Sequence, residues 1–387
     1  MKIIHTSDWH IGSRLYDYDR SADHSYTASM ISRICREQKP DALIVAGDLF
    51  HNDHPSAADQ RLVSEMFARL RTDLPGMAVI AIAGNHDSPS RHESHEAVFA
   101  AAGVTMRGRL TDRIDDWPRR YIIDVGTGVV VTIPFYVSRG TDLGALMAEA
   151  RRVAAERPVV VAAHTTISGS DTTGHDGRVV GMIDAVSASE FLPPESYDYL
   201  ALGHLHRPQR VGGDGRIRYS GSPLAVSFDE TYPHSVAVVE IERRGAVPEV
   251  EEIVIIPERP LITLPSPNVW ITWEDALEAL REFPADKEAF IRLNVLTADP
   301  LPSTAWDDAR RAAEGKLCRM CNINVRRFDN GDTDKETTGM SVEELRMASP
   351  LEVASRYAAS IGMELDGELF EEILKELTAG DTDNETA

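Results

Sequence analysis

Five short apolar runs in this chain end directly in histidine, aspartate or asparagine residues. They read IIHTSDWH (3–10), ALIVAGDLFH (42–51), AVIAIAGNHD (78–87), VVVAAH (159–164) and YLALGHLH (199–206). Unbroken apolar runs of this length indicate strands buried on both faces of a sheet that helices cover. Because the carboxyl ends of such strands meet at one edge of an α/β sheet, we expect the five polar ends to converge on one site.

The rest of the first 256 residues also favours an α/β fold. The segment DQRLVSEMFARL (Asp59–Leu70) has apolar residues at helical spacing and predicts one helix that covers the sheet. Further strand-like runs are expected at Val129–Pro134, Ile217–Tyr219, Ser235–Ile241 and Val250–Ile256. Residues 1–256 are therefore predicted to form the main domain.

The composition changes at residue 257. The stretch PERPLITLPSPN contains four prolines and predicts a linker or the edge of a new unit. Helix-like and strand-like patterns alternate beyond it, which predicts a small α+β capping domain at 257–330. Residues 331–387 begin with a polar stretch and continue with patterns for two or three short helices. These helices either fold back on the body or dock on a partner, and the sequence favours neither alternative.

The net charge of −22 argues, taken alone, against non-specific binding to nucleic acid. The charge is uneven, however, because residues 331–387 carry 15 acidic and 4 basic residues, a net charge of −11. The rest of the chain includes basic doublets such as Arg119-Arg120 and Arg326-Arg327. The total charge is therefore compatible with a DNA substrate.

The location of the protein is predicted from its cysteines and its apolar runs. Cys35, Cys318 and Cys321 make no disulfide framework, which is typical of a cytoplasmic protein. No apolar run approaches the ~20 residues that a membrane span needs. We therefore expect a cytoplasmic protein without a membrane partner.

The polar ends of the five runs have the composition of a site for two metal ions. Asp8 and His10 lie two positions apart, on the same side of an extended chain. Asp48 offers two carboxylate oxygens that can bridge two ions, and Asn85 offers a neutral oxygen. The remaining candidates are imidazoles, namely His164, His204 and His206. Nitrogen and oxygen ligands without a thiolate favour Mn, Fe, Zn or Co over a soft-metal site or a pure Mg or Ca site.

These residues also carry a family resemblance. The motifs DWH, GDLFH, GNHD and GHLH, together with the isolated His164, resemble those of the calcineurin-like metallophosphoesterases. The segments SDWHIGSRL, GDLFHNDHPS and YSGSPLAVSFDE (219–230) are similar to SbcD-type subunits of the double-strand-break-repair nucleases. The strong resemblance covers about residues 1–230. It implies a four-layer α/β/β/α sandwich with a small α+β cap and a helical C-terminal tail.

The resemblance implies a role for each motif residue. One ion is expected on Asp8, His10, Asp48 and His206, and the other on Asp48, Asn85, His164 and His204. His86 corresponds to the catalytic histidine, which positions the phosphate and donates a proton to the leaving oxygen, and Asp87 is expected to orient it. His51 lies where some members have a further histidine, and its role is left open. Arg14, Arg91 and Arg207 flank the motifs and are weaker candidates for contacts with phosphate.

The function implied by the resemblance is that of a Mn²⁺-dependent DNA nuclease subunit in an SbcC–SbcD-type complex. Such complexes act as 3′→5′ double-strand exonucleases and as endonucleases on single strands and hairpins, in DNA repair and recombination. The expected partners are an SbcC-type coiled-coil ATPase, double-stranded DNA ends and a second copy of the chain. The alternatives are a metallophosphodiesterase for small or cyclic nucleotides and a non-catalytic scaffold.

Overall fold

The computed structural model describes residues 1–173, 185–213 and 215–327, together with Leu351, Ser355, Gly367 and Phe370. Residues Met1–Arg327 form one compact unit. The predicted linker and tail helices at 331–387 lie outside the described residues, apart from the four named positions. Within the described part of the chain, no helix is both long enough and apolar enough to cross a membrane.

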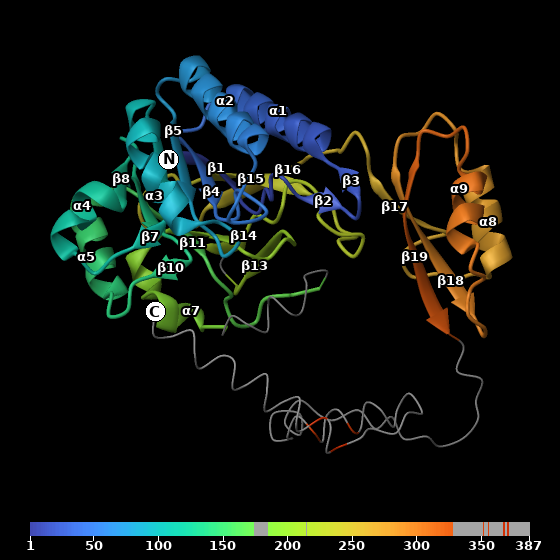
Figure 1. The fold of residues 1–387 in the computed structure, drawn as a ribbon. Coiled ribbons are helices and arrows are strands. Elements are labelled where there is room, and N and C mark those ends of the chain that lie inside the picture. Colours follow the sequence, from blue (N-terminus) through green and yellow to red (C-terminus); the bar gives the residue numbers. More distant parts are fainter. Residues whose placement is uncertain are drawn as a thin grey trace, which may run out of the picture. The chain divides into compact units, whose positions relative to one another are not determined.

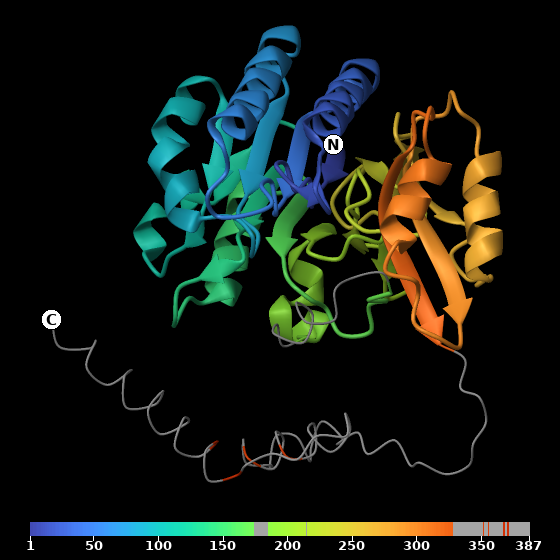
Figure 2. The ribbon, with the colours of Figure 1, turned by 45° about the vertical axis from the view of Figure 1, so that its right-hand side comes forward.

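The first sheet of the body has six strands in the order β16-β15-β1-β4-β5-β6 (Figure 1). These are β1 (Lys2–Thr6), β4 (Ala42–Ala46), β5 (Ala78–Ile82), β6 (Val104–Arg107), β15 (Ser235–Glu240) and β16 (Glu249–Val254). The first four are parallel, and β15 and β16 extend the sheet in antiparallel fashion. The parallel strands are joined by α1 (Ser21–Gln38), α2 (Ala57–Asp73) and α3 (Pro89–Ala101). Figure 2 shows α1 and α2 side by side over this sheet, where their apolar residues pack.

The second sheet also has six strands, in the order β13-β14-β12-β11-β9-β8. These are β8 (Ile122–Asp124), β9 (Val129–Ile133), β11 (Val159–His164), β12 (Tyr199–Gly203), β13 (Gln209–Val211) and β14 (Ile217–Tyr219). Its outer face packs on α4 (Trp117–Arg120) and α5 (Leu143–Ala154). Shorter elements are β2 (Arg14–Leu15), β3 (Tyr18–Asp19), β7 (Arg109–Leu110), β10 (Tyr136–Val137) and α7 (Ala188–Phe191).

The two sheets pack face to face through one apolar layer. In β4, Ile44 belongs to this layer together with Val160 of the second sheet, whereas Leu43 and Val45 face the helices. Both faces of the strand are therefore buried, which explains why the run ALIVA has no polar alternation. The order helix, sheet, sheet, helix confirms the predicted four-layer α/β/β/α architecture.

A third, smaller sheet follows in the chain after β16. It consists of three parallel strands, β17 (Leu261–Leu264), β18 (Phe290–Thr297) and β19 (Arg319–Arg327). The helices α8 (Trp273–Glu282) and α9 (Ala305–Ala312) connect them and pack on one face. Helices and strands alternate here, as the sequence predicts after the proline-rich stretch, but because the strands are parallel and joined by helices the arrangement is α/β and not α+β. We call residues 257–327 the cap.

The other face of the cap sheet contacts the body. Phe290 of β18 packs with Leu15 and Phe228 of the body. Arg259, which precedes β17, forms a buried ion pair with Asp23 of α1, with 2.8 Å between Nε and Oδ1. The cap is therefore joined to the body by both apolar and ionic contacts.

His5 of β1 is a buried polar group between the two large sheets. Its ring nitrogens lie 3.0 Å from the hydroxyl of Tyr199 and 3.1 Å from the carbonyl oxygen of Leu202, both on β12. Burial lowers the pKa of His5 to about 3. His5 therefore stays neutral in the folded protein at pH values at which the same histidine is already protonated in the unfolded chain.

We expect acidification to destabilise the metal-free protein through His5. The unfolded histidine takes up a proton near pH 6.5 and the folded one does not, so stability present above pH 6.5 is lost as the pH falls towards 3. The loss attributable to His5 is about 2 kcal/mol at pH 5. Urea unfolding of the wild type and of His5→Gln at pH 7.5 and pH 5 measures it. Equal pH dependence in the two proteins would contradict the assignment.

Candidate metal centre

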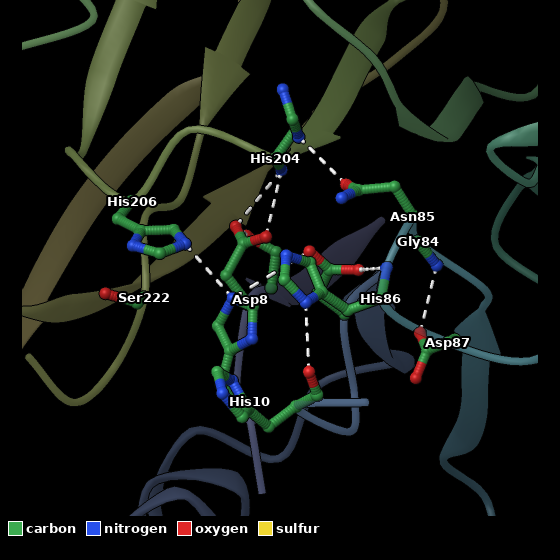
Figure 3. Close-up of polar contacts among 12 residues, drawn as sticks. Asp8, His10, Gly84, Asn85, His86, Asp87, His204, His206 and Ser222 are labelled. Atoms are coloured by element: carbon green, nitrogen blue, oxygen red, sulfur yellow. Dashed lines mark hydrogen bonds and ion pairs between the residues drawn. The ribbon is translucent and has the colours of Figure 1, made fainter. Parts of the chain in front are cut away.

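The predicted residues converge at the carboxyl ends of five strands. Asp8 and His10 follow β1, Asp48 follows β4, Asn85 and His86 follow β5, His164 ends β11, and His204 and His206 follow β12. Strands of both large sheets therefore contribute, and Figure 3 shows side chains from these loops turned towards one another. Asp8 is 0% exposed and Asp48 is 1% exposed, so two carboxylates are buried at one place. Buried carboxylates require compensation by hydrogen bonds, protons or cations.

The backbone is unusual at four of the candidate residues. Asp8, His10 and Asp48 have φ angles of 52°, 45° and 49°, and His204 has a φ of 104°. Non-glycine residues rarely adopt these conformations, which cost on the order of 1–3 kcal/mol each. Contacts with the surrounding residues must hold these backbone conformations. The conformations turn the chain sharply, so that side chains from consecutive positions reach the same point.

One group of ligand atoms is formed by Asp8, His10 and His206, whose ligand atoms all lie within 4.8 Å of one another. The Nε2 atoms of His10 and His206 are 3.0 Å apart. Two imidazole nitrogens at this distance either share a proton or bind a common cation. This arrangement fits a metal ion at the end of β1.

A second group is formed around Asp48 and His164, with 3.5 Å between Asp48 Oδ2 and His164 Nε2. The amide oxygen of Asn85 lies 3.0 Å from His164 Nε2 and 3.0 Å from His204 Nδ1. Asp48 Oδ2 is also 3.8 Å from His10 Nε2, so this carboxylate lies within reach of both groups. Asp8 lies near Asp48 and His164 as well, within 4.8 Å, which the sequence did not predict.

The charges at this centre favour a bound cation. Burial alone would raise the pKa of Asp48, but His164 and its neighbours hold that pKa below the ordinary range. Burial alone would lower the pKa of His164, but Asp48 raises it to about 9. A positive charge is therefore held between these two residues. A divalent cation can replace the proton, because metal ligands bind in their deprotonated forms.

His86 is held at the rim of the centre by two hydrogen bonds. Its backbone N–H donates to Asp48 Oδ1 over 2.8 Å, and its ring Nδ1 donates to the carbonyl oxygen of His51 over 2.9 Å. The ring lies edge-on to that of His10, with centroids 4.9 Å apart. Nε2 is therefore the ring nitrogen that the His51 carbonyl does not engage, and His86 also forms a third group of possible ligand atoms with His10 and His51, all within 4.8 Å of one another.

The predicted role of Asp87 needs correction. Its buried carboxylate accepts hydrogen bonds from the backbone N–H groups of Gly84, Leu49 and Phe50, at 2.9, 3.1 and 2.9 Å. Figure 3 shows it turned towards Gly84. The ring of His86 is oriented instead by the His51 carbonyl. Asp87 therefore ties the loop after β4 to the loop after β5, and so positions Asp48 and Asn85 together.

The four weaker candidates differ in their placement. The ring of His51 stacks on that of His86, with centroids 5.8 Å apart, and so lies at the centre. The three arginines contact their own surroundings. Arg14 donates to the Asp17 carbonyl, Arg91 donates to the Asp53 carbonyl, and Arg207 pairs with Asp171. None of these described contacts is with a candidate ligand.

Two groups that hold the ligands were not predicted from the sequence. Glu230 is buried, and its Oε1 accepts a hydrogen bond from His206 Nδ1 over 2.8 Å. Burial alone would raise the pKa of Glu230, but the hydrogen bond and charge of His206 bring it below the ordinary value. Ser7 donates to Asp8 Oδ2 over 2.6 Å. Glu230 ends the motif YSGSPLAVSFDE and Ser7 begins the motif SDWHIGSRL, so in both cases the motif was the available signal.

Comparison with known protein families agrees with this centre. Residues 1–208 match the family model of the calcineurin-like phosphoesterases. Residues 257–361 match the model described as the type 5 capsule protein repressor C-terminal domain. The first match ends just after His206 and so includes all seven candidate ligands, and the second includes the cap.

Three relatives, each named as the D subunit of the nuclease SbcCD, are similar over most of the chain. That of Rhodobacter capsulatus is 33% identical over 278 residues, which cover 64% of this chain and 68% of the relative. That of Escherichia coli K12 is 27% identical, covering 78% of this chain and 79% of the relative. That of Bacillus subtilis is 28% identical, covering 81% and 84%. The chain therefore belongs, as its motifs predict, to the SbcD-type nuclease subunits of the calcineurin-like phosphoesterase family, and it is a metal-dependent phosphodiesterase.

Proposed function

We propose that the protein is a Mn²⁺-dependent DNA nuclease that hydrolyses phosphodiester bonds at double-strand ends and in hairpins. The observation that carries this proposal is the pair of ligand groups that share Asp48. Two ions would be held there, one by Asp8, His10, Asp48 and His206, and the other by Asp48, Asn85, His164 and His204. Nitrogen and oxygen ligands without thiolates suit Mn²⁺.

The bound ions would supply Lewis acidity, which neutralises the phosphate and activates a water molecule. The protein's own residues do the rest. His86 has its Nδ1 proton committed to the His51 carbonyl, so a second proton on Nε2 would face the phosphate. From there it can position the phosphate and protonate the leaving oxygen. Asp87 holds the loop that carries Asp48 next to the loop that carries Asn85.

The two alternatives are less well supported. An enzyme for small or cyclic nucleotides needs the same ligands, but the similarity to nuclease subunits continues through the cap. A non-catalytic scaffold would be expected to lose ligands, whereas all seven are present and brought together. A nuclease is the function that accounts for both the centre and the cap.

The partner is proposed from the names of the relatives. They are subunits of SbcCD, so we propose an SbcC-type ATPase as the partner of this chain. We propose residues 331–387 as its docking region, residues 257–330 as the capping domain, of which the cap is the described part, and residues 1–256 as the nuclease domain. We further propose a cytoplasmic homodimer, in which two centres meet two DNA ends. The three cysteines are free, which agrees with a reducing compartment.

One experiment tests the activity and the docking region together. The chain is purified with and without residues 331–387, stripped of metal, and supplied with Mn²⁺ or Mg²⁺. Linear duplex DNA, a DNA hairpin and a cyclic nucleotide serve as substrates, and capture of the ATPase is measured in parallel. We expect Mn²⁺-dependent cleavage of both DNAs by both proteins, and capture of the ATPase by the full chain alone. Hydrolysis of only the cyclic nucleotide would refute the nuclease, and capture by the shortened chain would refute the docking region.

A further inference from the structure

Glu230 is the residue that fixes the ring of His206. With its Oε1 2.8 Å from His206 Nδ1, an ionised carboxylate accepts the Nδ1 proton and leaves the Nε2 lone pair directed away from Glu230. That Nε2 is the atom 3.0 Å from His10 Nε2. A carboxylate placed in this way sets the tautomer and the orientation of a ligand histidine.

The position of Glu230 is set by its own loop. Its Oε2 accepts hydrogen bonds from the Val226 backbone N–H, at 3.2 Å, and from the Ser222 hydroxyl, at 3.4 Å. His234 Nε2 lies 3.6 Å from the same oxygen. The side chain of Glu230 is 1% exposed, so solvent cannot compensate if the loop moves. The place of the carboxylate therefore follows the place of residues 222–234, which we call the anchor loop.

The cap holds the anchor loop next to Glu230. Arg292 of β18 donates from Nη1 to Asp229 Oδ1 over 2.6 Å and from Nη2 to the Phe228 carbonyl over 3.3 Å. Its guanidinium also lies over the Phe228 ring, 5.2 Å from the centroid. Within the cap, its Nε donates to Thr263 Oγ1 of β17. Arg292 is 6% exposed, whereas the Asp229 side chain is 68% exposed, so the guanidinium is buried although water reaches its partner carboxylate.

The anchor loop is loosely packed on another side, which makes its link to the cap through Arg292 more important. A cavity of about 330 Å³ lies between the anchor loop and the segment that leads from β16 into the cap, lined by residues such as Tyr232, Ile256 and Pro260. The loop is therefore not packed tightly against that segment. A displacement of the cap sheet would be transmitted to Asp229 and Glu230 through Arg292.

We propose that Glu230 is a positioning residue for His206, and that Arg292 makes the affinity of this metal position depend on the placement of the cap. The inference rests on the proposed function, because it assigns His206 as a ligand. It gives the cap a task at the metal centre. Any partner or substrate that shifts the cap would then change metal affinity at His206, and binding of metal would in turn favour one placement of the cap.

The first test measures Mn²⁺ binding by calorimetry, separately from activity. We expect wild type to bind two ions, and Glu230→Ala to bind one of them about 10- to 100-fold more weakly while the other is unchanged. Glu230→Gln keeps an oxygen acceptor without the charge and should lie between the two. Binding of two ions by Glu230→Ala with wild-type affinity would overturn the inference. Failure of the wild type to bind Mn²⁺ would refute the proposed function as well.

The second test separates Arg292 from a general loosening of the cap. Arg292→Met keeps the aliphatic stem and removes the contacts with the anchor loop, and we expect a loss of affinity of about threefold to tenfold at the same ion. Arg259→Met is the matched control, because it removes another buried guanidinium between cap and body, whose partner is Asp23 of α1. It should leave Mn²⁺ affinity unchanged. An equal loss in both variants would overturn the role of Arg292.

The double variant Glu230→Ala/Arg292→Met decides whether the two residues act along one route. If Arg292 acts through Glu230, its removal costs nothing further once Glu230 is absent. The affinity of the double variant should then equal that of Glu230→Ala. Additive losses would show that Arg292 affects the centre by another route and would overturn the proposed coupling.

Discussion

Replacement of His86 by asparagine is expected to abolish DNA hydrolysis and to leave Mn²⁺ binding intact. Asparagine retains the backbone N–H that donates to Asp48 Oδ1, so the loop keeps its place. It cannot carry the second proton that the imidazole offers to the leaving oxygen. General acid catalysis of this kind contributes about 10²- to 10⁴-fold, and the loss of phosphate positioning adds to it.

The measurement for His86 pairs a cleavage assay with calorimetric titration of Mn²⁺. His95→Asn is a matched control, because His95 lies on α3, and its ring Nδ1 is 3.1 Å from the Arg91 carbonyl oxygen. The control should keep both activity and two bound ions. If metal occupancy fell in step with activity in His86→Asn, His86 would itself be a ligand.

The layers of the fold could be predicted only in part. The apolar runs correctly indicated doubly buried strands, because Leu43 and Val45 face helices while Ile44 faces the opposite sheet. The pattern could not show that two sheets exist. An aliphatic side chain such as Val160 is equally suited to a helix or to another sheet, so the partner of each face is decided by tertiary packing. The family resemblance, and not the periodicity, predicted four layers.

The candidate ligands were predictable because each follows a strand. The sequence placed these strands in one sheet, whereas they belong to two sheets whose carboxyl ends meet at the same place. The groups that hold the ligands were not predictable. Asp87 lies next to His86 in sequence, yet its oxygens reach the backbone of Leu49 and Phe50. Glu230 is 24 positions from His206 and meets it only after the anchor loop folds back. Such contacts depend on which polar groups the folded chain brings next to each carboxylate. The residues that are adjacent in sequence do not reveal them.

The second large effect is expected from a single added methyl group at Gly84. A Cβ atom there would lie 2.1 Å from Asp48 Oδ1 and 2.4 Å from the Asp48 backbone nitrogen. Rotation of the Asp48 side chain relieves only the first of these contacts. The second is with backbone, so the loops after β4 and β5 must separate. Gly84→Ala is therefore expected to displace the carboxylate that both ligand groups share.

We expect Gly84→Ala to lose both Mn²⁺ ions from the calorimetric titration and at least about 10²-fold in DNA cleavage, as displacements of about 1 Å do in other centres. Gly76→Ala is the matched control, because Gly76 precedes the same strand and a Cβ atom there meets nothing within 4 Å. It should keep two ions and full activity. The backbone N–H of Gly84 also donates a hydrogen bond to Asp87, next to the close approach between Gly84 and Asp48. If Gly84→Ala bound two ions normally, the approach of the two loops would not be what places Asp48, and the sharing of Asp48 between the two ions would have to be abandoned.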